Sequence, residues 1–244
     1  MTLSRTAVAL QSVSKTYAGT QQDVPVLRDI TVGFQQGALT AIMGPSGSGK
    51  TTLLHAAAGL DRPSSGRVLL GDTDLGSMSE RELTRLRRRR IGFVFQQFNL
   101  LPMLTVSENV ALAMRVNGRH PRRAEVTAAL QKVGLADHAG RRPAELSGGQ
   151  QQRVAIARTL IAAPEVVFAD EPTGSLDRRT GRQIMALLRD LADRDGRTVV
   201  MVTHDPAAAA WADRVLFLVD GRLAGSLDAP TADSVAAALN EWDR

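Results

Sequence analysis

The 244-residue chain contains no cysteine, which excludes disulfide bonds and thiolate metal sites. It also lacks a run of about 20 apolar residues, the length needed to span a bilayer. Residues 1–17 break their apolar run with polar side chains and show no clear cleavage site, which argues against a signal peptide. We therefore expect a protein that stays in the cytoplasm and has no membrane span.

Aromatic residues make up only 4% of the chain, and Tyr17 is its single tyrosine. The formal net charge of +5 permits an acidic partner, either nucleic acid or the anionic face of a membrane. The densest basic stretch, Arg85–Arg90, is interpreted as the solvated face of a helix. Nucleic-acid grooves combine basic and aromatic side chains, but here the phenylalanines follow in an apolar, strand-like run. We expect no nucleic-acid partner.

Three short apolar runs are present, at residues 38–43, 166–170 and 198–205. Such runs are typical of strands buried on both faces of a parallel sheet. A helical pattern follows each run, at residues 50–60, at 180–196 and in an alanine-rich stretch that ends at Trp211. The repeated order of strand, loop and helix predicts a doubly wound α/β fold.

Other segments depart from this pattern. Residues 7–17 and 27–37 alternate as antiparallel strands do, and Asp220-Gly221 lies at the centre of a predicted hairpin. Residues of about 98–160 are mostly helical in pattern, which predicts a helical subdomain inserted into the α/β core. We treat residues 1–244 as a single domain.

The C-terminal segment predicts one more helix. Val235, Leu239 and Trp242 share one of its faces, which we expect to dock on the core of the same chain.

The stretch Gly44–Thr51, GPSGSGKT, matches the phosphate-loop pattern and lies between a predicted strand and a predicted helix. Its glycines allow the backbone to approach the β- and γ-phosphates of a nucleotide closely. Lys50 supplies a positive charge there, and the Thr51 hydroxyl is a ligand for Mg²⁺.

Two carboxylates end the buried run at residues 166–170. Asp170 stands where P-loop enzymes place a second contact to Mg²⁺, usually through water. Glu171 is one residue further along and can face an attacking water as a general base. Gln96 and His204 also follow predicted strands and should emerge at the ligand-binding edge of the sheet.

A second pair of glycines, in LSGGQ at residues 146–150, begins another predicted helix. Backbone N–H groups at such a helix start can bind a phosphate. Because the chain already has a phosphate loop, the sequence raises the question of whose phosphate the second motif binds.

In chain order the motifs are Tyr17, GPSGSGKT, FVFQQFNLLP, LSGGQ, VVFADEP, GSLD and VTHD. This set resembles the ATP-binding subunit of an ABC transporter and spans nearly the whole chain. The stretch IGFVFQQFNLLP, with LTVSENV after it, is similar to the branch of macrolide-export and lipoprotein-release ATPases. The resemblance implies a P-loop NTPase core, with a mainly parallel sheet, N-terminal antiparallel strands and an inserted helical subdomain.

The resemblance also implies roles for single residues. Tyr17 would stack on adenine, Glu171 would be the base, and His204 would hold the γ-phosphate and the attacking water. Gln96, the first of two adjacent glutamines after its strand, would contact Mg²⁺ and report the nucleotide state to the helical subdomain. We expect catalysis by Glu171, His204, Lys50 and Gln96, and Mg²⁺ binding by Thr51, Gln96 and Asp170. The expected ATP-binding residues are Tyr17, Gly44, Pro45, Ser46, Gly47, Ser48, Gly49, Lys50, Thr51, Thr52, Gln96, Ser147, Gly148, Gly149, Gln150 and His204.

The family pattern answers the question about the second motif. It implies that Ser147, Gly148 and Gly149 hold the γ-phosphate bound to Lys50 of a second copy, with Ser175–Asp177 as a loop that crosses between copies. Two ATP molecules would then join the copies head to tail, and hydrolysis would release them. Whether the two subunits are identical stays open.

The leading functional hypothesis is an ATPase that powers a separate integral membrane permease from the cytoplasmic face of the membrane. Export is favoured by resemblance alone, and peptide, lipid, lipoprotein and drug substrates are all open. A second hypothesis is a non-transport membrane complex that transmits ATP-driven motion to extracytoplasmic effectors. Soluble ABC proteins of DNA repair or translation are disfavoured, because the chain has neither heptads nor cysteines and only one cassette.

Overall fold

The computed structural model describes residues 6–19 and 22–242. An antiparallel sheet is built, in spatial order, from β2 (Val24–Gln35), β1 (Thr6–Tyr17), β4 (Ser65–Leu70) and β5 (Thr73–Asp74). A larger sheet is built, in spatial order, from β10 (Arg222–Asp228), β9 (Arg214–Val219), β3 (Leu39–Met43), β8 (Thr198–Val202), β7 (Val166–Asp170) and β6 (Ile91–Phe95). Its pairs are parallel except for the hairpin of β9 and β10. The predicted α/β fold is confirmed.

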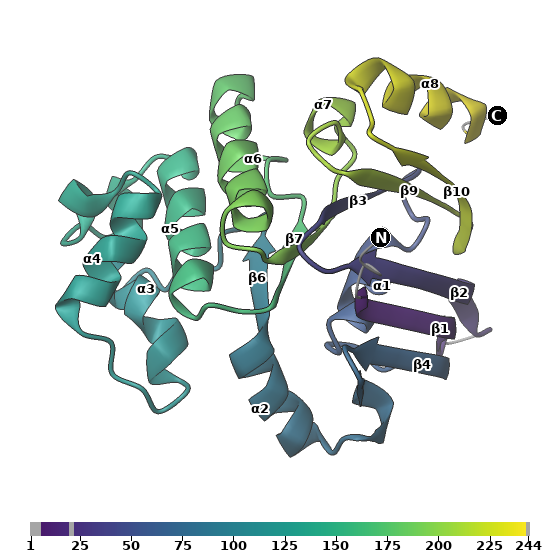
Figure 1. Cartoon of the computed structure of the whole chain (residues 1–244), viewed down its shortest axis with the longest axis horizontal. Helices are drawn as coiled ribbons and strands as arrows, with labels where there is room; N and C mark the ends of the chain where they lie inside the picture. The colour runs from purple at the N-terminus through teal and green to yellow at the C-terminus, as the bar shows by residue number, and fades with distance from the viewer. Residues whose placement is uncertain (1–5, 20–21, 243–244) are drawn as a thin grey trace.

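The helices are α1 (Lys50–Ala57), α2 (Glu80–Arg90), α3 (Val106–Arg115), α4 (Arg123–Lys132), α5 (Gly148–Ile161), α6 (Arg178–Asp193), α7 (Pro206–Ala209) and α8 (Ala232–Trp242). Short 3₁₀ turns lie at Leu75–Ser77, Ala136–His138 and Pro143–Glu145. Figure 1 shows α3, α4 and α5 gathered on one side of β6, while the antiparallel sheet lies on the opposite side of the molecule. Between β6 and β7 the chain is helical, over the range where a helical insertion was predicted.

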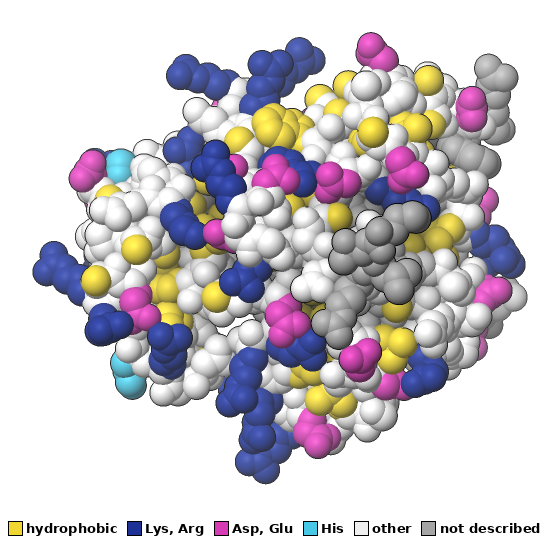
Figure 2. Space-filling model, viewed as in Figure 1, with side chains coloured by type: hydrophobic (Ala, Val, Ile, Leu, Met, Phe, Trp, Pro, Cys, Tyr) yellow, Lys and Arg dark blue, Asp and Glu magenta, His cyan; other side chains and the backbone are white. Residues whose placement is uncertain are grey.

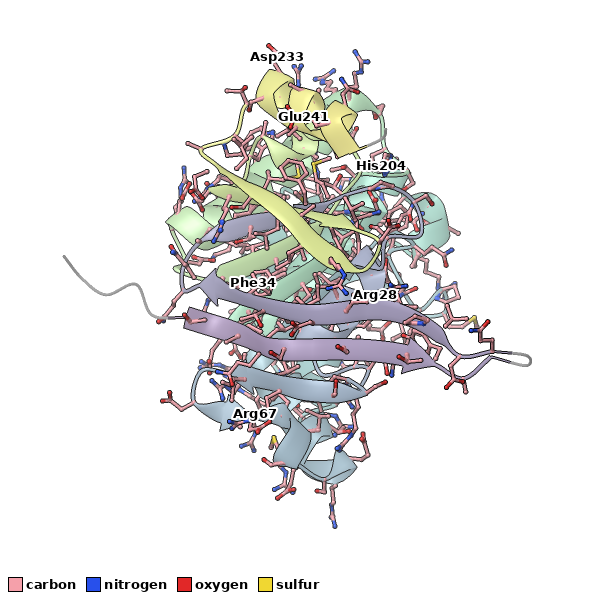
Figure 3. The ribbon with its side chains drawn as sticks, turned by 90° about the vertical axis from the view of Figure 1, so that its right-hand side faces the viewer. Arg28, Phe34, Arg67, His204, Asp233 and Glu241 are labelled. Carbon is pink, nitrogen blue, oxygen red and sulfur yellow. The ribbon has the colours of Figure 1, made fainter. Side chains whose placement is uncertain are left out.

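Two hydrophobic clusters hold these layers together. Every residue of β3 and β8 is buried, which explains their nearly continuous apolar sequences. One cluster packs one face of the large sheet against α3 to α8. The other fills the space between the two sheets and includes α1, with Phe34 of β2 fully buried in it (Figure 3).

The C-terminal part of the chain differs from the prediction in one respect. The alanine-rich helix ends at Ala209 and does not extend to Trp211. Beyond the helix, the Asp213 carboxylate accepts a hydrogen bond from the Leu39 N–H (2.8 Å) and the Asp213 N–H donates to the Leu39 carbonyl (2.8 Å), which aligns the chain with β3 at the start of β9. In α8, Val235 is fully buried and Leu239 packs on the same core, as predicted, while the side chain of Trp242 lies outside the described part of the chain.

The arginine run forms the last turns of α2. Figure 2 shows basic side chains projecting from the surface where α2 lies, and Arg85 and Arg89 are exposed as predicted. Two other arginines of the run, Arg87 and Arg90, are half-buried and form hydrogen bonds with other parts of the chain. Arg87 donates to the Gly59 carbonyl (2.7 Å), and Arg90 forms a two-pronged pair with Glu165 (2.7 and 2.8 Å). The run is therefore only partly a solvated face.

Candidate active site

The phosphate-loop motif connects β3 to α1, as the sequence predicted. Gly44 leaves the strand with φ of 150°, and a Cβ at this position would lie 1.9 Å from the Leu218 carbonyl oxygen, so no other residue fits. The Lys50 ammonium donates to the carbonyls of Gly44 (2.9 Å) and Pro45 (2.7 Å), which places its charge along the inside of the loop. Burial lowers the pKa of Lys50 from its usual value, although the carboxylates of Asp170 and Glu171 oppose that shift.

A hairpin turn from the far end of the chain supports this loop. Asp220 and Gly221 both have positive φ, 47° and 74°, which is the geometry of a two-residue turn between β9 and β10. The Gly221 N–H donates to the Ser48 carbonyl (3.2 Å), and the Gly221 carbonyl accepts from the N–H of Arg28 in β2 (2.8 Å). Arg28 is labelled beside this hairpin in Figure 3. The phosphate loop is thus fixed between both sheets.

The two predicted carboxylates stand at the end of β7. Asp170 accepts from the Thr51 hydroxyl (3.3 Å), and its burial raises the pKa of its carboxyl group. Glu171 has φ of 47°, an uncommon value for a residue with a side chain. Its N–H donates to the Val202 carbonyl at the end of β8 (3.0 Å), which ties this strained residue to the neighbouring strand.

His204 and Gln96 follow different strands, β8 and β6, and both lie near Glu171. His204 Nδ1 lies 2.9 Å from Glu171 Oε1, and Glu171 Oε2 is buried without a partner among the described residues. The Gln96 amide lies against Gly174, where an added Cβ would come within 3.0 Å of Gln96 Nε2 and 3.5 Å of the Glu171 Cβ. The structure therefore gathers these three predicted residues next to the phosphate loop.

The LSGGQ residues occupy a separate place. Ser147 caps α5: its hydroxyl accepts from the Gln150 N–H (3.3 Å), and its own N–H donates to Gln150 Oε1 (2.9 Å). A Cβ on Gly149 would lie 2.2 Å from Cγ2 of Thr180, so the helix start is packed against α6. Within residues 6–19 and 22–242, no hydrogen bond or ion pair joins Ser147–Gln150 to the phosphate loop. The two predicted phosphate-binding motifs do not meet in one chain.

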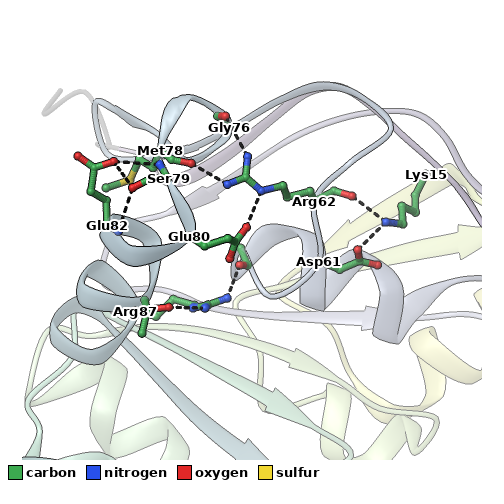
Figure 4. A network of polar contacts seen from close by, with 11 residues as sticks. Lys15, Asp61, Arg62, Gly76, Met78, Ser79, Glu80, Glu82 and Arg87 are labelled. Carbon is green, nitrogen blue, oxygen red and sulfur yellow. Dashed lines mark hydrogen bonds and ion pairs between the residues drawn. The ribbon is translucent and has the colours of Figure 1, made fainter. Parts of the chain in front are cut away.

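Tyr17 ends β1 with its side chain 41% exposed. Its hydroxyl donates to Asp61 Oδ2 (2.5 Å), which is the main reason that the pKa of Tyr17 is raised. Lys15 Nζ bonds the other oxygen of Asp61 (2.5 Å) and lies 4.8 Å from the centroid of the Tyr17 ring. Figure 4 shows the continuation of this network, in which Lys15 also donates to the carbonyl of Arg62, and Arg62 pairs with Glu80. These hydrogen bonds and ion pairs fix the Tyr17 ring at the end that carries its hydroxyl.

Sequence reasoning missed two polar side chains of α5. Gln152 is fully buried and donates to the carbonyls of Pro172 and Phe95. Arg158 donates to the carbonyls of Phe98 and Asn99, and burial lowers the pKa of its guanidinium. The available signal was weak: three adjacent glutamines point in different directions from a helix, but their equal polarity does not say which one faces the core.

The residues present fit a nucleotide with Mg²⁺. The hydroxyl of Ser48 and one oxygen of Glu171 are buried with no partner in the described chain, so both can contact a bound group. Thr51 and Asp170 offer neighbouring oxygen ligands of the kind that Mg²⁺ prefers. Among the described residues, no cluster of three acidic, histidine or cysteine side chains could hold a metal by itself. These few oxygen ligands fit Mg²⁺, which proteins usually bind through one or two side chains together with the phosphates of a substrate.

A protein-family model described as "ABC transporter" matches residues 27–174 of the chain. The chain belongs to the ABC transporter family. It is 47% identical over 218 residues to an uncharacterized ABC transporter ATP-binding protein, YvrO, of Bacillus subtilis, a match that covers 88% of this chain and 95% of the relative. It is 44% identical to the macrolide export ATP-binding/permease protein MacB of Burkholderia pseudomallei, where the match covers 94% of this chain but only 35% of MacB.

Solved structures agree with the sequence relatives. The dimeric ATP-binding cassette MJ0796 of Methanocaldococcus jannaschii, in a post-hydrolysis state bound to ADP and Pi, superposes with a TM-score of 0.84 at 41% identity. That match covers 91% of this chain and 98% of the cassette. The protein is therefore an ABC-type ATPase that binds and hydrolyses ATP. Within residues 6–19 and 22–242, each helix is too short or too polar to span a lipid bilayer.

Proposed function

We propose that two copies of this ATPase close around two ATP molecules and that their cycle powers a separate membrane permease. One observation supports the proposed dimer. Ser147–Gln150 forms a capped helix start but, among the described residues, has no hydrogen bond to the phosphate loop of its own chain. A second copy placed head to tail brings the two motifs to one nucleotide. The dimeric structures solved for MJ0796 support this arrangement.

Each nucleotide would be bound at its phosphates and at its base. The backbone of Gly44–Thr51 and the Lys50 ammonium hold the β- and γ-phosphates. Thr51, Asp170 and Gln96 would hold Mg²⁺, which neutralises charge on the phosphate oxygens when it is bound. The Tyr17 ring, fixed by its hydrogen bond to Asp61, stacks on the adenine.

Hydrolysis would proceed through Glu171. Its carboxylate accepts the proton of the attacking water, while Oε1 is oriented by His204. Because a carboxylate only accepts hydrogen bonds, Nδ1 of His204 carries the hydrogen. His204 Nε2 is then the ring atom left to face the attacking water and the γ-phosphate.

The dimer is tested by cross-linking, since the chain has no cysteine of its own. In the Glu171→Gln background, Ser46→Cys in the phosphate loop and Gly148→Cys in α5 would lie on opposite sides of one ATP. A short bifunctional thiol reagent suits this gap, because a disulfide needs Cα atoms within about 7 Å. We expect covalent dimers with ATP, few from either single variant, and recovery on mixing the two singles. An internally linked monomer would show that the motifs meet within one chain and would overturn the proposal.

The permease would dock beside Gln96. Leu101 and Met103 follow it and are 45% and 82% exposed, so two large apolar side chains face solvent close to Gln96 in the sequence. We propose that residues 98–160 act as a helical subdomain that carries this surface and holds the protein at the cytoplasmic face of the membrane. The MacB relatives, named as export ATP-binding/permease proteins, favour export.

Co-purification from membranes tests the permease. We expect one integral protein to accompany the wild-type ATPase and to be lost from Met103→Asp, while the ATPase activity of the isolated variant is unchanged. Val116→Asp is the control. Val116 is also an exposed apolar residue (49%), and its replacement should leave the complex intact. Equal recovery of the integral protein with Met103→Asp would contradict this surface.

A further inference from the structure

The buried amide of Gln152 joins the ends of two strands that carry the predicted catalytic groups. Its Nε2 donates to the Pro172 carbonyl (2.7 Å) and to the Phe95 carbonyl (3.3 Å). Pro172 directly follows Glu171, and Phe95 directly precedes Gln96. One side chain therefore fixes the backbone beside both residues.

Packing alone does not explain a glutamine at this position. The side chain is 0% exposed, and its Oε1 has no hydrogen-bond partner among the described residues. A buried acceptor without a partner is destabilising, and such groups in folded proteins call for a separate reason. The geometry offers a reason for the glutamine: its Nε2 bonds the carbonyls of Pro172 and Phe95.

Arg158 lies about two turns further along α5 and contacts the loop that follows Gln96. Its guanidinium donates to the carbonyls of Asn99 (2.6 Å) and Phe98 (3.0 Å), both of which have positive φ. Gln96 is thus bracketed by bonds from α5 to the residue before it and to the residues two and three positions after it.

We propose that Gln152 is a positioning residue for ATP hydrolysis: it holds Gln96 and Glu171 at a fixed separation and ties both to α5, the helix capped by Ser147. The inference rests on the roles proposed above for Gln96 and Glu171. Gln152 does not touch the reacting atoms, so its removal should lower kcat and leave the KM for ATP nearly unchanged.

The same helix supplies a matched control. Thr159 is buried on the same face of α5, and its hydroxyl donates to the Phe93 carbonyl (2.9 Å), two residues upstream on the same edge strand. Thr159→Val removes a comparable buried bond between α5 and β6 without touching the residues beside Gln96 or Glu171. Gln152→Met keeps the length of the side chain and removes both donated bonds.

The experiment compares kcat, KM and thermal midpoint for the wild type, Gln152→Met, Thr159→Val and Glu171→Gln. We expect Gln152→Met to lower kcat by about 10-fold or more, since small displacements of positioned groups are costly, with KM within about 3-fold. Thr159→Val should stay within about 2-fold of wild type in kcat. If Gln152→Met does not fold, Gln152→Asn, which keeps an amide one methylene shorter, replaces it and should show the same loss of kcat.

Two results would overturn the inference: a wild-type kcat in the Gln152 variant, or equal losses of kcat in both α5 variants that follow their thermal midpoints. Glu171→Gln separates this failure from that of the proposed mechanism. If Glu171→Gln retains wild-type hydrolysis, the proposed base is wrong. If Glu171→Gln is slow and Gln152→Met is not, only the positioning role fails.

Discussion

His204 Nδ1 lies 2.9 Å from one carboxylate oxygen of Glu171, and the second oxygen is buried with no partner among the described residues. The two oxygens are therefore inequivalent: one is bonded to His204 and the other is buried without a partner. A base needs this arrangement, because the carboxylate must be fixed in space and still keep a lone pair for the proton of water.

Glu171→Gln should keep ATP binding and slow hydrolysis by about 10²- to 10⁴-fold, because an amide preserves the shape of the side chain but cannot accept the proton. The variant should accumulate as an ATP-bound dimer, visible by size-exclusion chromatography. Steady-state hydrolysis within a few-fold of wild type would rule out Glu171 as the base.

His204→Ala should lower kcat by roughly 10²-fold, because the carboxylate loses the group that orients it. The loss should not add to that of Glu171→Gln, since the two residues act as one unit. A double-mutant cycle on kcat measures this coupling, with His120→Ala, on a histidine outside the site, as the control. Fully additive losses would mean that His204 acts independently of Glu171.

Lys50→Ala should fail at an earlier step, nucleotide binding, because the phosphates lose their positive partner. Titration with a fluorescent ATP analogue measures the affinity. Lys132→Ala is the control, since Lys132 pairs with Asp195 on the exposed surface away from the loop. Unchanged affinity in Lys50→Ala would count against the phosphate-binding role.

Tyr17→Ala should weaken ATP binding by about 1–3 kcal/mol, the usual scale for stacking of a base on an aromatic ring, whereas Tyr17→Trp should preserve it. Asp61→Asn should give a smaller loss, because the ring remains but loses the carboxylate that holds its hydroxyl. Equal ATP affinity for Tyr17→Ala and Tyr17→Trp would make Tyr17 a structural residue only.

Asp170→Asn should separate stability from activity. Because burial raises the pKa of Asp170, the folded state holds the proton more tightly than the unfolded state. Stability therefore falls as the pH rises from the unfolded pKa to the raised folded pKa, and the full cost of the ionised carboxylate is present above the folded pKa. At neutral pH the variant should therefore unfold at a higher temperature than wild type. Its Mg²⁺-dependent hydrolysis should fall by at least about 10-fold, because an oxygen ligand for the ion has lost its charge. A lower thermal midpoint would contradict the electrostatic argument.

Much of this architecture could be predicted because the chemistry falls at strand ends. Asp170, His204 and Gln96 each follow an apolar run, and the parallel sheet brings those ends to one edge. The position of Gln152 could not be predicted, since adjacent glutamines of equal polarity differ only in the direction that helix packing gives them. The Tyr17–Asp61 bond joins residues far apart in the chain and depends on how α1 ends, which no local pattern specifies.

The turn at Asp220–Gly221 has a consequence for biosynthesis. The phosphate loop is made early, but the N–H that bonds the Ser48 carbonyl comes from Gly221, which is added much later. During translation, residues 44–51 therefore leave the ribosome long before the strand that supports them exists. A nascent chain that ends before β9 would have the complete phosphate-binding sequence without its scaffold, so nucleotide binding should appear only after the turn between β9 and β10 has been made.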